Sequence, residues 1–184
     1  MTAESPNGRG VSMVSKIPGV DYDGDLISVR ARYVTSTPMQ RMKVIGDRLA
    51  DDPYNCPNKL VTMVSAVEGF ARGLVVQHDV TTADRMHKRY AKFRFCTPEY
   101  LVEKSLRLHG KGRAVDFFKE DTWTLFLLAV EFRNLVIHDA TYLGGDKFPE
   151  LIGASAEVLS ALATLAGVPD NKIAETLTAT LASR

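Results

Sequence analysis

The stretch of sequence that decides the fold is WTLFLLAVEFRNLVIHD, residues 123–139. Its first eight residues are apolar except for one threonine, which is typical of a helix in a protein core. Polar side chains then interrupt the apolar run at Glu131, Arg133, Asn134, His138 and Asp139. Because burying a polar group without a partner costs roughly 2–7 kcal/mol, we expect these residues to have partners or a function.

These polar side chains occupy different faces of the predicted helix. At about 100° per residue, Glu131, Asn134 and His138 form one narrow stripe. A second stripe suits a core and contains Leu125, Leu128, Phe132, Leu135 and Val136. Arg133 lies about 140° around the helix from His138, so the two meet only through the length of the arginine or across a symmetry axis. This division favours a site at an interface between two chains.

The residues Arg133-Asn134-x-x-x-His138, followed by an acidic residue and a turn that contains glycine, resemble the Arg-x4–6-His motif of the HEPN superfamily. The common version of that motif has a polar residue, often Asn, directly after the Arg. The resemblance covers the second half of the motif helix and the helical context from about residue 57 to residue 182. It implies an all-α, HEPN-like helical bundle that forms a homodimer. It also implies a metal-independent endoribonuclease of toxin–antitoxin or antiviral defence systems, with RNA as its substrate and, for a toxin, a neutralising partner protein.

The residue types of the motif suit RNA cleavage. Histidine exchanges protons near neutral pH, so His138 can accept the 2′-hydroxyl proton or protonate the leaving oxygen. Arg133 is always charged and can hold a phosphate through two hydrogen bonds, while Asn134 orients His138 or the phosphate, or else is a helix-packing amide. Two chains supply two histidines, one as base and one as acid. The resemblance implies products with a 2′,3′-cyclic phosphate and a 5′-hydroxyl.

Three neighbouring residues have supporting roles in this interpretation. Glu131 orders the motif arginine or sets the tautomer of the motif histidine; the alternative is a solvated or interface carboxylate. Asp139 caps the following turn. Tyr142 is a loop aromatic that stacks on a base, or packs in the core. In one HEPN subgroup an adenylylated tyrosine stands two residues after the histidine, and here that position is Ala140, so this form of control is not expected.

Two other interpretations stay open. In the first, Arg133 and His138 belong to a structural network, and the protein is a non-catalytic HEPN-like module that binds a nucleotide, nucleic acid or partner protein. In the second, the chain is a helical scaffold unrelated to HEPN. The net charge of +1 favours the binding module, because it provides no general attraction for nucleic acid. The intact motif favours the enzyme.

Length and composition predict one globular domain. The chain has 184 residues, of which 45% are hydrophobic and 24% charged, enough to bury a core without disulfides. Cys56 and Cys96 form no CxxC pair, as expected for free thiols in a reducing compartment. No apolar run approaches the roughly 18 residues of a membrane span, and a signal-peptide core is lacking. We therefore expect a cytoplasmic protein with no membrane segment and no cofactor.

The beginning of the chain is interpreted as an N-terminal arm, residues 1–35, mobile or extended. Residues 1–24 are rich in Gly, Ser, Pro and Asp, a composition that does not offset its ordering entropy. Residues 26–34 alternate with a period of two, which is typical of a strand or an extended segment. The helical bundle domain is expected to comprise residues 36–184.

Apolar spacing and capping signals predict the helices of the bundle. They are expected at residues 37–50, 57–77, 81–94, 98–108, 120–138 and 149–166, with a last helix from residue 170. Thr37 and Pro38 mark the start of the first helix. A capping box of Thr81 with Asp84 is expected at the start of the third helix. Glycines at 69 and 73 lie on one face, which is expected to let another helix approach closely.

The strongest basic segment combines positive side chains with Tyr90 and Phe93. Its candidates for nucleic-acid binding are Arg85, Lys88, Arg89, Lys92 and Arg94. Such a mixture can hold a phosphate backbone and stack bases; the alternative is a solvated helix face. The nearby acidic and histidine residues lack metal-ligand spacing, so no metal site is expected.

Overall fold

The computed structural model describes residues 21–51, 57–138 and 148–181, and these residues form nine helices and no strand. The helices are α1 (Tyr22–Thr35), α2 (Pro38–Ala50), α3 (Pro57–Gln77), α4 (Ala83–Phe93), α5 (Pro98–Leu108), α6 (Ala114–Phe117), α7 (Glu120–His138), α8 (Phe148–Leu165) and α9 (Asp170–Leu181). The all-α class expected from the sequence is confirmed.

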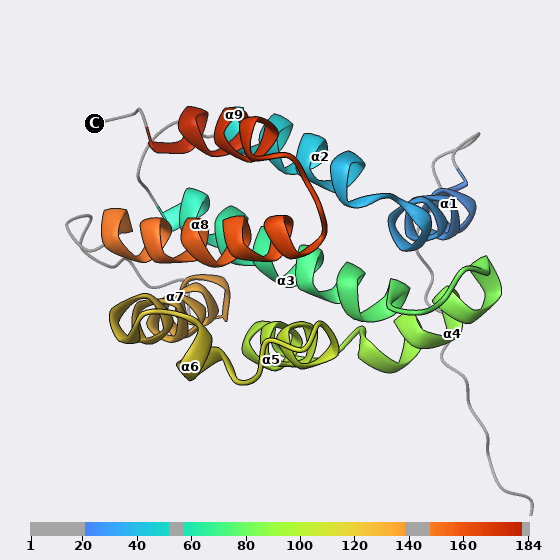
Figure 1. Cartoon of the computed structure of the whole chain (residues 1–184). Helices are drawn as coiled ribbons and strands as arrows, with labels where there is room; N and C mark the ends of the chain where they lie inside the picture. The colour runs from blue at the N-terminus through green and yellow to red at the C-terminus, as the bar shows by residue number, and fades with distance from the viewer. Residues whose placement is uncertain (1–20, 52–56, 139–147, 182–184) are drawn as a thin grey trace, which may run out of the picture.

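The helices are arranged around α3. Figure 1 shows α3 and α8 side by side in a middle layer, with α2 and α9 on one side and α5, α6 and α7 on the other. Helices α1 and α4 lie at one end of this arrangement, and both contact α3. The core contains fully buried side chains from the middle layer, such as Phe70, Ile152 and Leu159. Because α3 contacts helices in every layer, its side chains connect the candidate site to the rest of the fold.

Most helix boundaries agree with the signals in the sequence. Thr37 accepts a hydrogen bond from the Gln40 backbone N–H at 3.2 Å, and the Gln40 side chain accepts one from the Thr37 N–H at 2.8 Å, which forms a capping box. Gly110, after α5, has a φ of 69°, a conformation that glycine adopts without strain. The capping box predicted for Thr81 is wrong, because α4 begins after Thr82 and lacks a side-chain cap. The short α6 was not predicted.

The extended or strand-like conformation predicted for residues 26–34 is also wrong. These residues belong to α1, which Asp21 caps by accepting a hydrogen bond from the Gly24 N–H at 3.0 Å. The alternation of apolar and polar residues does not indicate a strand here, because the apolar residues do not form a buried face. Ile27 and Val29 are 67% and 53% exposed, and Val34 alone is buried within α1. Residues 1–20 of the predicted arm lie outside the described part of the chain.

Helix α7 faces the core with a stripe that agrees only in part with the predicted one, since Leu125 and Phe132 pack against the core. Its buried residues include Phe126, Ala129 and Val130, whereas Leu128 and Leu135 are 39% and 42% exposed. The prediction that these two leucines point into the core is therefore wrong. The cause is the packing of α7 against α3 and α8, which turns the other side of the helix outward.

Two of the described helices, α3 and α8, are long and apolar enough to resemble membrane spans, which the sequence analysis did not expect. An 18-residue window in α3 and another in α8 each have a mean hydropathy of 1.3, so both helices could cross a membrane by length and composition. More than half of each window is buried within the bundle. Core helices share these properties, because a helix that is apolar all round is either buried or lies in a membrane.

Candidate functional site

The arginine of the motif is held by an ion cluster between α7 and α3. One Nη atom of Arg133 donates to Glu68 Oε2 at 3.0 Å, and the other carboxylate oxygen of Glu68 accepts a short hydrogen bond from Arg72. Arg133 also donates to Asn134 Oδ1 at 3.1 Å. The side chains of Glu68, Arg72 and Arg133 are 18%, 11% and 20% exposed, so the cluster lies at the edge of the core.

The ion cluster keeps a net positive charge, because two guanidinium groups share one carboxylate. Burial alone would lower the pKa of Arg72, but its hydrogen bond and attraction to Glu68, together with neighbouring Tyr33, outweigh burial and raise that pKa. The Nε atom of Arg133 is buried without a hydrogen-bond partner among the described residues. The single carboxylate of Glu68 therefore neither balances the charge of the two guanidinium groups nor accepts a hydrogen bond from the Arg133 Nε.

His138 lies on the opposite side of α7 from Arg133. It is the exposed last residue of the helix, and its side chain makes no hydrogen bond with another described residue. Together with Leu128, Glu131 and Leu135 it forms an exposed stripe along α7, which we call the α7 stripe. Asn134 is exposed beside this stripe. Within one chain, the structure thus brings Arg133 to Asn134 but does not bring Arg133 to His138.

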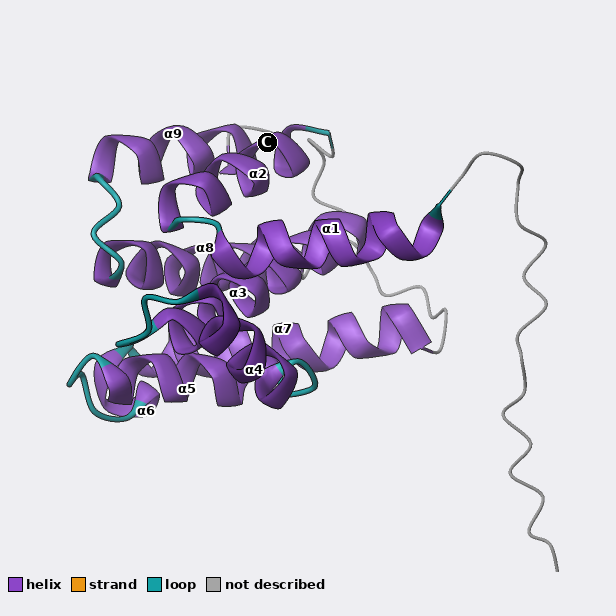
Figure 2. Ribbon diagram, turned by 90° about the vertical axis from the view of Figure 1, so that its right-hand side faces the viewer, coloured by secondary structure: helices purple, strands orange, loops and turns teal. Residues whose placement is uncertain are grey.

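Figure 2 shows how α7 presents its C-terminal half. This end of the helix extends past α4 and α5 toward the same side as the N-terminal end of α1. The predicted supporting residues Asp139 and Tyr142 lie outside the described residues. The supporting residue Glu131 is exposed and has no ion pair within them. Its predicted contact with Arg133 is replaced by that of Glu68.

The residues of the basic segment on α4 divide into two groups. Arg85, Lys88, Lys92 and Arg94 are exposed. Arg89 is half-buried, and its guanidinium donates to the carbonyl of His78 and, at 3.4 Å, to that of Val75. Arg89 thus binds the last carbonyl groups of α3, as basic side chains commonly do at helix C-termini.

The basic helix also reaches the ion cluster. Arg72 Nε donates to the backbone carbonyl of Phe93 at 3.3 Å, which places the end of α4 next to the cluster. Arg94, which follows, lies over the ring of Phe95 at 4.3 Å from the centroid. Phe95 is 83% exposed. An exposed aromatic ring with a guanidinium is a surface on which a nucleic-acid base can stack.

Sequence reasoning missed Glu68 and Arg72, although a signal for them was present. They stand four residues apart in a helix whose other residues from 60 to 77 carry no charge. An acidic and a basic residue at this spacing pair on one helix face. In an apolar helix such a pair marks a place where a third polar group enters the core, and that group is Arg133.

Comparison with known proteins finds no matching family model, no similar curated protein and no similar solved structure. Over the described residues, no group of three His, Cys, Asp or Glu side chains is arranged to hold a metal ion. The site is therefore interpreted from its own residues.

Proposed function

We propose that this protein is a metal-independent endoribonuclease of HEPN type that cleaves RNA at a site shared by two chains. The observation that carries the proposal is the Arg133–Asn134 pair, held in a net positive cluster on the helix that ends with an exposed His138. An imidazole supplies the acid–base catalysis and a guanidinium the charge stabilisation that favour phosphodiester cleavage by the 2′-hydroxyl.

The reaction follows from the chemistry of these groups. One histidine removes the proton from the 2′-hydroxyl, whose oxygen forms a bond to phosphorus. The bond from phosphorus to the 5′ oxygen breaks, and the second histidine protonates that oxygen. The products are a 2′,3′-cyclic phosphate and a 5′-hydroxyl, and Arg133 balances the charge that develops on the phosphate oxygens.

A second chain completes the site in this proposal. Within one chain Arg133 and His138 occupy different faces of α7, so a partner has to supply the missing group. The α7 stripe offers a suitable contact, because Leu128 and Leu135 are exposed apolar side chains next to the polar residues. Symmetric dimers form through such self-complementary patches. The exposed charges of α4, near Arg72, extend the positive surface along which RNA would lie.

The ion pair between Arg133 and Glu68 favours a second candidate function. Because this pair ties α7 to α3, the motif arginine can be structural, and the protein is then a non-catalytic module that binds a nucleotide, nucleic acid or partner protein. The two functions differ in what His138 does, since its exposed side chain makes no hydrogen bond or ion pair with a described residue.

RNA cleavage in the presence of EDTA tests the proposal. The purified protein should cleave RNA without added metal, and His138→Ala should reduce the rate by about 10²–10⁴-fold, the contribution of general acid–base catalysis. The thermal unfolding temperature of His138→Ala should stay unchanged, because the side chain is exposed.

His87→Ala is the matched control, since His87 is an exposed histidine on α4. This variant should retain the activity of the natural protein. Absence of cleavage by the natural protein, combined with a large loss of stability in Arg133→Gln, would contradict the enzyme and support the binding module.

A further inference from the structure

A pocket between α1, α2 and α3 has no role in the proposed ribonuclease. Its volume is about 580 Å³, which is within the range of small-molecule sites. The residues that line it include three arginines, Arg32, Arg41 and Arg48, and no acidic residue. Much of the remaining lining is apolar, for example Ile45 and Phe70.

Arg41 is the buried polar residue of this pocket. It is 5% exposed, and its Nη atoms donate to the carbonyl of Tyr33 at 3.1 Å and to Gln77 Oε1 at 3.3 Å. Both partners are neutral, and its Nε is buried with no partner among the described residues. Burial lowers the pKa of Arg41, although the attraction of Tyr33 partly opposes this effect. A buried guanidinium normally pairs with a carboxylate, because its desolvation is costly.

The backbone of α3 makes room for this guanidinium. A Cβ atom on Gly73 would overlap the Arg41 side chain, so any larger residue there would displace the guanidinium. The sequence predicted a close approach at Gly69 and Gly73, and side chains of α1 and α2 fill that place: Tyr33 donates to the Gly69 carbonyl at 2.6 Å, and Arg41 lies against Gly73. The arginine is thus built into the fold.

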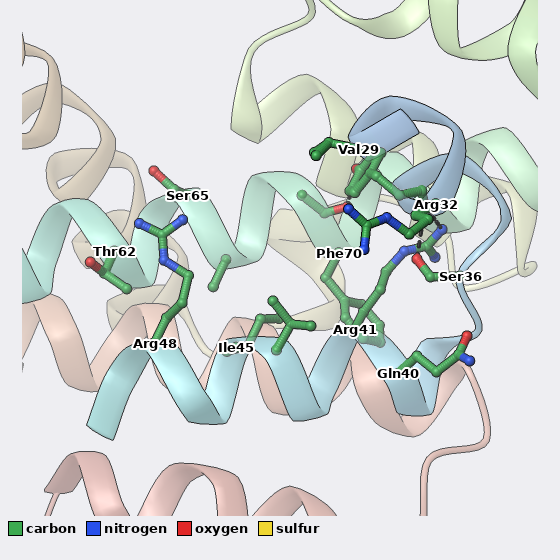
Figure 3. A pocket seen from close by; sticks show the side chains of 14 residues that line it. Val29, Arg32, Ser36, Gln40, Arg41, Ile45, Arg48, Thr62, Ser65 and Phe70 are labelled. Carbon is green, nitrogen blue, oxygen red and sulfur yellow. Dashed lines mark hydrogen bonds between the residues drawn. The ribbon is translucent and has the colours of Figure 1, made fainter. Parts of the chain in front are cut away.

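Figure 3 shows the arrangement of the arginines around the pocket. Arg41 rises from α2 toward α1, where Arg32 and Ser36 lie, and Arg48 lies at the other end beside Thr62 and Ser65. Arg32 and Arg48 are exposed and have no ion pair with a described residue. Two arginines therefore converge at one end of an apolar pocket without any carboxylate to balance them.

We propose that this pocket binds a small amphiphilic anion, with its carboxylate or phosphate group between Arg32 and Arg41 and its apolar body along Ile45 and Phe70. Arginine recognises both acids through paired, charge-assisted hydrogen bonds. Arg32, which is exposed and has no ion pair with a described residue, gives the site an accessible donor, and the lack of acidic lining residues leaves its positive charge uncompensated. The apolar wall makes burial of a hydrocarbon or aromatic body favourable. This inference is independent of the ribonuclease proposal.

Calorimetric titration of the full chain with four probes tests the inference. Decyl phosphate and decanoate combine an acid with an apolar body, decanol lacks the acid, and inorganic phosphate lacks the body. The two anionic amphiphiles should bind one per chain. Decanol should bind at least about tenfold more weakly because it loses a charge-assisted hydrogen bond, and inorganic phosphate at least about tenfold more weakly because it has no apolar body to bury. Binding of decanol or of inorganic phosphate as tight as that of decyl phosphate, or no saturable binding, would overturn the inference.

Two variants locate the binding in this pocket. Arg32→Gln should weaken decyl phosphate binding by about tenfold, whereas Arg30→Gln, which changes an exposed arginine of the same helix outside the lining, should leave it unchanged. Ser65→Phe should fill part of the pocket and also weaken binding, with circular dichroism to verify that the variant is folded. Equal binding by Arg32→Gln, Arg30→Gln and the natural protein would place the ligand elsewhere and reject the site.

Discussion

At the scale of single residues, Glu68 is the centre of the candidate site, because it separates two positive charges. Glu68→Gln should lower the free energy of unfolding by about 2 kcal/mol, less than for a fully buried ion pair because the cluster is partly exposed, since Arg72 and Arg133 would then face each other without a carboxylate. Urea unfolding measures this change.

The control for this prediction is Glu131→Gln, the same chemical change at an exposed position of α7. It should change the free energy of unfolding by at most about 0.5 kcal/mol. Equal losses in the two variants would mean that the contacts of Glu68 with the two arginines contribute nothing specific to stability.

The residues of the site differ in how far the sequence reveals them. Arg133, Asn134 and His138 could be identified because polar residues in an apolar helix are conspicuous. The contact between Arg133 and Glu68 could not, because the two residues are 65 positions apart and only the packing of α7 on α3 brings them together. Arg41 was missed because it does not interrupt an apolar run in the sequence. Its burial depends on packing between helices, which local sequence does not reveal.

At the scale of elements, α2 depends on the capping box at its start. Thr37→Ala should lower the free energy of unfolding by about 1 kcal/mol, because the hydrogen bond from the Gln40 N–H is lost. Thr82→Ala is the matched control, since Thr82 occupies the same position before α4 but makes no side-chain cap. A loss in Thr82→Ala as large as that in Thr37→Ala would contradict this role of the capping hydrogen bond. Chemical denaturation of both variants provides the comparison.

The elements predicted well are those with strong local signals. Helices α3, α5 and α7 begin and end at the predicted residues. Start and stop residues such as proline, acidic residues or glycine lie next to their apolar spacing and define the ends. Helix α1 lacks such a pattern. It is mostly exposed, and contacts made far along the chain, such as the packing of Tyr33 against Tyr90 with ring centroids 5.6 Å apart, hold it in place. Local alternation therefore indicated the wrong structure.

At the scale of the whole molecule, the proposed site requires two chains, and mixing experiments can detect this. If each site uses His138 from both chains, a mixed dimer of natural and His138→Ala chains is inactive. An equal mixture, unfolded and refolded together, should then retain only about a quarter of the activity, because random pairing leaves that fraction of fully natural dimers. The rate of RNA cleavage should be proportional to the square of the fraction of natural chains in the mixture.

A mixture with His87→Ala chains is the control and should retain full activity at every ratio. A straight-line decrease with His138→Ala, to half the activity at an equal ratio, would show that each chain cleaves RNA alone. That outcome would remove the shared site while leaving the chemistry of His138 intact.

The position of Tyr33 has a consequence for how the molecule would behave with both sites occupied. Tyr33 lines the arginine pocket and neighbours Arg72, and Arg72 shares Glu68 with Arg133. An amphiphile that displaces the Tyr33 ring would shift Arg72 and thereby change the ion pair between Glu68 and Arg133. Thermodynamic reciprocity then requires RNA to change the affinity for the amphiphile by the same factor as the amphiphile changes the affinity for RNA. The Tyr33 ring would then couple the two proposed sites.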